Sequence, residues 1–162
     1  MERWFGELEP GPKVTNPVAP RVTLAAPVSE ELKDQVPVTR LYRAWSGPGL
    51  NDRETLALKL GMSVLGGLSS SRLDNALVRG EQLAVGVAAS AQDFEQVTFL
   101  QTYMDVKPGA ERAKAEARYD ELLASYIAEG PTADEIKRAA TQYVSGTIGQ
   151  PVLPPTALRI VQ

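Results

Sequence analysis

The sequence predicts an α+β domain, in which one mostly antiparallel β-sheet carries its helices on one face. The chain has 162 residues, a length that suits a single hydrophobic core. Apolar residues make up 43% of it and charged residues 23%, as in an ordinary globular protein. Its apolar positions repeat with strand and helix periods in the order strand, strand, helix, helix, strand, strand, helix, helix.

Two strands are expected first. Residues 21–25 alternate polar and apolar side chains, as a half-buried strand does. Residues 36–45 predict a second strand, and Gly47-Pro48-Gly49 should end it because glycine and proline favour turns. The sheet is therefore expected to begin near residue 21.

Two helices should follow. Asn51 is a favoured N-cap residue, and Glu54 can reach back to the backbone N–H of that cap. The apolar stripe of this helix comprises Ala57, Leu60, Gly61 and Val64, with Leu56 beside them. Gly66-Gly67 is expected to end the helix by allowing a positive φ. A shorter helix is expected over residues 70–78, closed by Gly80.

Two more strands are expected in the second half. Residues 83–90 are small and apolar, which favours a strand that helices approach closely. Residues 97–106 show the best strand pattern. One face of that strand carries Val97, Phe99 and Tyr103, and the other carries Leu100, Met104 and Val106.

A long helix is expected over residues 110–129, ended by Gly130-Pro131. Its apolar stripe comprises Ala115, Tyr119, Leu122, Leu123, Tyr126 and Ile127. Thr132 and Glu135 predict a capping box at the start of a last helix. The apolar face of that helix comprises Ile136, Ala139, Ala140, Tyr143 and Val144.

The chain divides into three parts. Residues 1–20 are rich in proline and predict an extended connector. Residues 21–148 hold the predicted elements of the folded domain. Residues 149–162 predict an extended tail or a truncated end, because the helical pattern stops at Ile148 and three prolines follow.

The composition excludes most catalytic chemistry within this chain. There is no Cys and no His, which removes disulfides, thiol nucleophiles, Ser-His-Asp triads and the usual zinc ligands. The net charge of −3 does not suit a nucleic-acid surface. No apolar run approaches the roughly 20 residues that a membrane span needs. We also expect no signal peptide, because residues 1–6 hold no apolar segment.

The serines Ser69, Ser70 and Ser71 lie at an expected helix start, where a hydroxyl can cap the helix. A serine hydrolase centred on Ser70 is an alternative, but a serine nucleophile needs a base to take its proton. Arg79 flanks Gly80 in a tight connection, which indicates a surface loop or a substrate contact.

Four segments together resemble the M16 metallopeptidase family, which includes insulinase, pitrilysin and mitochondrial processing peptidase relatives. Residues 65–73 (Leu-Gly-Gly-Leu-Ser-Ser-Ser-Arg-Leu) are similar to the family's Leu-Gly-Gly-x-x-Ser-Ser-Arg-Leu turn. Residues 74–87 are similar to the stretch that follows it. Residues 129–139 resemble its Gly-x-Thr-x-x-Glu-Leu-x-x-Ala helix start. Residues 4–8 resemble the end of a preceding M16 domain, so the connector would come from that domain.

The resemblance implies a non-catalytic M16 domain, because the family's zinc motif H-x-x-E-H is absent from this chain. In the family such a domain forms half of a peptide-binding chamber, opposite a catalytic domain in the same polypeptide or in a separate subunit. No cofactor is expected in this chain, and zinc is expected in the partner. The composition and the family's habits favour a bacterial periplasmic protein.

The resemblance also suggests candidate residues. The family's non-catalytic half offers an Arg and a Tyr toward the substrate, but a gap-free alignment places Val78 and Val85 at those positions. Arg79 matches only when the alignment shifts by one residue. Candidate substrate or interface residues are therefore Ser69, Ser70, Ser71, Arg72 and Arg79. A structural or assembly subunit that kept the fold without a peptidase role is the alternative function.

Overall fold

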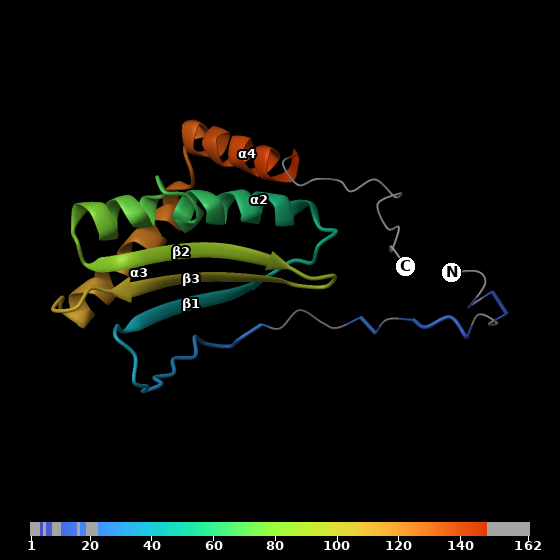
Figure 1. Cartoon of the computed structure of the whole chain (residues 1–162), viewed down its shortest axis with the longest axis horizontal. Coiled ribbons are helices and arrows are strands. Elements are labelled where there is room, and N and C mark those ends of the chain that lie inside the picture. The colour runs from blue at the N-terminus through green and yellow to red at the C-terminus, as the bar shows by residue number, and fades with distance from the viewer. Residues whose placement is uncertain (1–3, 5, 8–10, 16, 19–22, 149–162) are drawn as a thin grey trace, which may run out of the picture.

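A computed structural model describes residue 4 and residues 6–7, 11–15, 17–18 and 23–148. The elements of that part of the chain are three strands, three α-helices and two π-helical segments (Figure 1). In chain order the elements are β1 (Arg40–Gly47), α2 (Arg53–Met62), η1 (Ser63–Gly67), η2 (Asp74–Gly80), β2 (Ala84–Asp93), β3 (Thr98–Val106), α3 (Arg112–Glu129) and α4 (Ala133–Ile148). Half of the predicted connector (residues 1–20) and all of the predicted tail (residues 149–162) lie outside the described residues.

The sheet has the order β1-β3-β2, and both pairs are antiparallel. Thr102 of β3 is the partner of Arg43 in β1 and of Ala89 in β2. The register of β2 shifts between Ala84 and Gly86, which marks a β-bulge. Figure 1 shows α2 running along β2, with α4 on the outer side of α2. The α+β class with an antiparallel sheet is confirmed.

Strict alternation in β3 separates the two faces of the sheet. Its even-numbered residues are buried, and they are Thr98, Leu100, Thr102, Met104 and Val106. The helices complete the core with Met62, Leu65, Leu73, Leu77, Ala115, Tyr119 and Leu123. Burial raises the pKa of Tyr119 to about 12, and its hydroxyl donates to Thr102 Oγ1. The predicted faces of this strand are therefore confirmed.

The strand predicted over residues 21–25 is wrong where the structure describes it. Residues 23–25 are not in a strand, and residues 21–22 lie outside the described part. Leu24 is 69% exposed, so the alternation has no buried side to favour pairing with a neighbour. The sheet instead begins at Arg40, within the second predicted strand.

The start of α2 differs from the prediction by one residue. Asp52, not Asn51, is the N-cap, because Asp52 N donates to Gly49 O at 3.0 Å and its carboxylate accepts from Glu54 N at 2.9 Å. The buried residues of this helix are Thr55 and Met62, whereas Leu56 and Ala57 are exposed. The predicted stripe is therefore confirmed only in part: Val64 is buried and Leu60 and Gly61 are half-buried. The buried positions spread around the helix because the sheet covers one side of it and α4 another.

Two further details differ from the predictions. The pair Gly66-Gly67 does end the helix, but positive φ among described glycines occurs only at Gly109 and Gly130. At Gly66 a glycine is needed because η1 approaches β2 closely: a Cβ there would lie 2.8 Å from Ala89 N.

Ile127 was assigned to the buried stripe of α3 and is instead 76% exposed.

Candidate functional site: the serine turn and Arg79

The turn that joins η1 to η2 holds the three candidate serines, and they differ in their exposure to solvent. Ser69 and Ser70 are exposed, whereas Ser71 is 1% exposed. Ser71 N donates to Leu68 O at 3.0 Å, and Ser71 Oγ accepts from Asp74 N at 3.4 Å. Ser71 therefore caps the following helical segment, and only Ser69 and Ser70 face outward.

Arg72 turns inward and joins the turn to the start of α4. Its Nε and Nη2 donate to the two carboxylate oxygens of Glu135, each at 2.8 Å, and Nη2 also donates to Gly130 O at 2.9 Å. The guanidinium lies 5.1 Å from the ring centre of Tyr126. The hydrogen bonds with Glu135 raise the pKa of Arg72. This geometry makes Arg72 a link between elements.

Arg79 lies at the outer surface of η2 and is the candidate that the structure brings to the serines. Its Nε donates to Asp74 Oδ2 at 2.6 Å, and its Nη2 donates to Ser69 O at 2.7 Å. Its side chain is 61% exposed. Two bonds thus fix the guanidinium beside the outward serines while leaving much of it open to solvent.

The π-helical spacing of η2 explains why Arg79 occupies this place. Glu81 N donates to Ala76 O, five residues back, and the side chains of Asp74 and Arg79 are also five residues apart. In an α-helix the residue one turn after Asp74 would be Val78. Here Val78 packs against the core. The wider turn therefore leaves Arg79 at the surface beside Asp74.

The turn can donate hydrogen bonds from several groups. A guanidinium and two exposed hydroxyls can bind a peptide carbonyl or a carboxylate. The carboxylate of Asp74, which lies next to the turn, accepts a hydrogen bond from Arg79. These contacts favour binding over proton abstraction from a serine.

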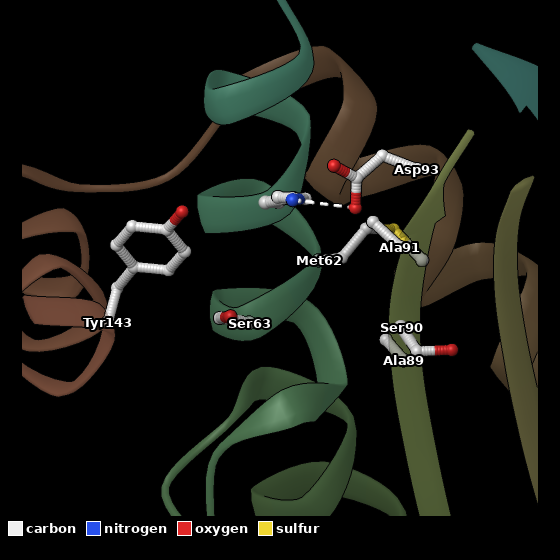
Figure 2. A pocket seen from close by; sticks show the side chains of 8 residues that line it. Met62, Ser63, Ala89, Ser90, Ala91, Asp93 and Tyr143 are labelled. Atoms are coloured by element: carbon white, nitrogen blue, oxygen red, sulfur yellow. Dashed lines mark ion pairs between the residues drawn. The ribbon is translucent and has the colours of Figure 1, made fainter. Parts of the chain in front are cut away.

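A pocket that the sequence analysis did not predict lies between α2, α4 and β2 (Figure 2). Its volume is about 260 Å³, and its lining residues are Lys59, Met62, Ser63, Ala89, Ser90, Ala91, Asp93 and Tyr143. Lys59 Nζ lies 2.7 Å from Asp93 Oδ1, and this bond lowers the pKa of Asp93. The small residues of β2 were the only sequence signal for this space.

The described residues form no metal-binding cluster and no membrane-spanning helix. No group of three or more Asp, Glu, His or Cys side chains is placed to hold a metal ion there. None of the described helices combines the length and the apolar character needed to cross a bilayer.

The fold is an antiparallel α+β domain with a donor-rich turn, and the sequence contains no His and no Cys. The family model described as "Peptidase M16 inactive domain" matches residues 1–143. This chain belongs to that family, and the resemblance found in the sequence is confirmed. No curated protein matched the chain.

Solved structures share the fold. A protease from Helicobacter pylori superposes with a TM-score of 0.64 at 18% identity, over 72% of this chain and 28% of that one. The peptidase M16 inactive domain from Pseudomonas fluorescens gives 0.61 at 20% identity, over 67% and 26%. The "inactive peptidase domain of a putative zinc protease" from Bordetella parapertussis gives 0.60 at 23% identity, over 69% and 62%. The chain thus spans only about a quarter of the first two.

Proposed function

We propose that this chain is the non-catalytic half of a peptide-binding chamber in an M16-type zinc peptidase. The zinc-bearing half would be a catalytic M16 domain, in the same polypeptide or in a separate subunit. Membership of the inactive-domain family supports this proposal, and so does a sequence without His, which cannot supply H-x-x-E-H. Zinc would therefore be held by the partner domain.

The position of Arg79 is the observation that carries the proposal. The family's non-catalytic half offers an arginine to the substrate, and Arg79 would take that role if the alignment shifts by one residue. Its exposure beside the serines supports this assignment, whereas Val78 packs against the core. The bonds to Asp74 and Ser69 orient the guanidinium, so less side-chain entropy is lost on binding. We assign Arg79 a role in holding the peptide, with Ser69 and Ser70 beside it.

No second family residue supports direct assistance to catalysis. Val85, at the family's tyrosine position, is 52% exposed beside the β-bulge and has no hydroxyl to donate. We therefore propose that this half binds and orients the peptide, while bond cleavage takes place at the partner's zinc. Ser71 and Arg72 would contribute by keeping the turn in place.

The test is to combine the chain with the H-x-x-E-H-bearing M16 polypeptide of its source organism and measure cleavage of an internally quenched peptide. The chain alone should be inactive, and the mixture should be active. Arg79→Ala should raise KM about tenfold with a smaller change in kcat, because a charged hydrogen bond to substrate is lost. Arg79→Lys should restore part of the affinity.

Arg138→Ala is the matched control, because Arg138 is an exposed arginine on α4. Its KM should equal that of the unaltered chain. An unchanged KM for the Arg79→Ala variant would show that Arg79 does not bind the peptide. Stable assembly into a large complex without any zinc-bearing partner would instead support a structural subunit.

A further inference from the structure

The hairpin end of the sheet presents apolar side chains to solvent. We call this end the tip, and it consists of the loop at residues 47–50 and the β2–β3 turn at residues 94–97. Leu50 is 52% exposed, Phe94 50% and Val97 39%. Side chains of this kind on one protruding feature are typical of an interaction surface.

The tip is firmly built rather than loose. Thr98 Oγ1 donates to Pro48 O and Thr55 Oγ1 donates to Gly49 O, both at 2.6 Å, and both threonines are buried. Leu50 N donates to Phe94 O at 2.8 Å and so joins the loop to the turn. Because the backbone is fixed, the exposed side chains are presented in a set arrangement, which lowers the entropy lost on docking.

The loop and the turn also fit tightly against each other. A Cβ at Gly49 would lie 2.3 Å from Glu95 O, so only glycine permits this contact. The close fit makes the loop and the turn one surface.

The N-terminal connector reaches the same end of the molecule. Gln96 Nε2, on the turn, donates to Pro17 O at 2.8 Å. Figure 1 shows the dark blue part of the connector lying at the hairpin end of the sheet. The connector therefore contacts the tip at Gln96.

The charges around the tip are mostly negative. Asp52, Glu54 and Glu95 are exposed there and Arg53 is the nearby exposed cation, so three acidic groups face one basic group. Such a rim is complementary to a partner with basic side chains around an apolar centre.

We propose that the tip is the docking surface for the zinc-bearing catalytic domain. This inference rests on the proposed function, because that function supplies the partner. Leu50, Phe94 and Val97 form the apolar centre of the contact, and the acidic rim orients the partner. When both domains belong to one polypeptide, the connector held at Gln96 raises the effective concentration of the catalytic domain at the tip.

The experiment uses the whole chain and the H-x-x-E-H-bearing M16 polypeptide of its source organism. The variant Phe94→Ser/Val97→Thr removes the apolar centre and should weaken binding measured by calorimetry by about tenfold or more. Ile127→Ser is the matched control, since Ile127 is a 76% exposed apolar residue on α3, and its affinity should be unchanged. Circular dichroism should show all variants folded.

Each outcome separates the two proposals. If the unaltered chain does not bind the partner, the proposed function fails and the tip has no partner. If the unaltered chain binds and the tip variant binds equally well, only the docking inference is overturned. If the tip variant abolishes dimers of this chain in sedimentation, the tip binds a second copy and the inference is overturned. If the tip variant abolishes peptide binding in the absence of the partner, the tip binds peptide and the inference is likewise overturned.

Discussion

The ion pair of Arg72 with Glu135 shows how single residues hold the serine turn in position against the start of α4. The Arg72 guanidinium holds the pKa of Glu135 at about 2, well below its ordinary value of 4.5. The same carboxylate accepts from Thr132 N at 2.7 Å and completes the capping box of α4. One carboxylate thus stabilises both the helix start and the serine turn.

At the residue scale we predict that Glu135→Gln lowers the free energy of unfolding by about 1–3 kcal/mol at pH 7. A depressed folded-state pKa means that the contribution is present above pH 4.5 and is lost as pH falls toward about 2. The difference between the variant and the unaltered chain should therefore shrink over that interval in urea unfolding.

The control for this prediction is Glu129→Gln. Glu129 also faces Arg72, at 3.8 Å, but its side chain is 68% exposed, so its loss should cost less than about 0.5 kcal/mol at any pH. A Glu135→Gln deficit that stays constant from pH 7 to pH 3 would show that the charge of Glu135 does not stabilise the fold.

At the scale of elements, the contact of η1 with β2 depends on one of two adjacent glycines. A Cβ at Gly66 would lie 2.8 Å from Ala89 N and 3.0 Å from Ala88 C, which are backbone atoms that cannot move cheaply. We predict that Gly66→Ala destabilises the fold by about 1–3 kcal/mol. Thermal unfolding measures this.

Gly67→Ala is the matched comparison for that variant. Its Cβ would come no closer than 3.4 Å to Ala89 O, and alanine favours helical backbone, so its stability should be equal or higher by up to about 1 kcal/mol. If both variants lose the same stability, the tight approach at Gly66 does not govern how η1 packs.

Local patterns were sufficient to predict the elements that carry strong periodicity or capping signals. The alternation of β3 and the Thr132–Glu135 capping box were both identified from sequence, and both are observed. The π-helical turn of η2 was missed, because its extra residue per turn depends on how Leu77 and Val78 pack against the core. The inward turn of Arg72 likewise depends on Glu135, which is 63 residues distant.

At the scale of the whole molecule, the sheet with α2, α3 and α4 forms the packed unit, and the described residues before β1 are mostly exposed on its outside. Val14, Val18 and Leu32 are 83–90% exposed. The contacts of these described N-terminal residues include the Gln96–Pro17 hydrogen bond and an exposed ion pair of Glu31 with Arg112 at 3.4 Å. Exposed contacts of this kind contribute little to stability.

We therefore predict that a chain lacking residues 1–35 unfolds in urea with a free energy within about 1 kcal/mol of the full chain. A chain lacking residues 131–162 should lose several kcal/mol, because it removes buried Ala139, uncovers α2 and leaves Arg72 without Glu135. Equal losses from the two deletions would mean that the N-terminal segment belongs to the core. The expected inequality would leave that segment available for contacts outside this domain.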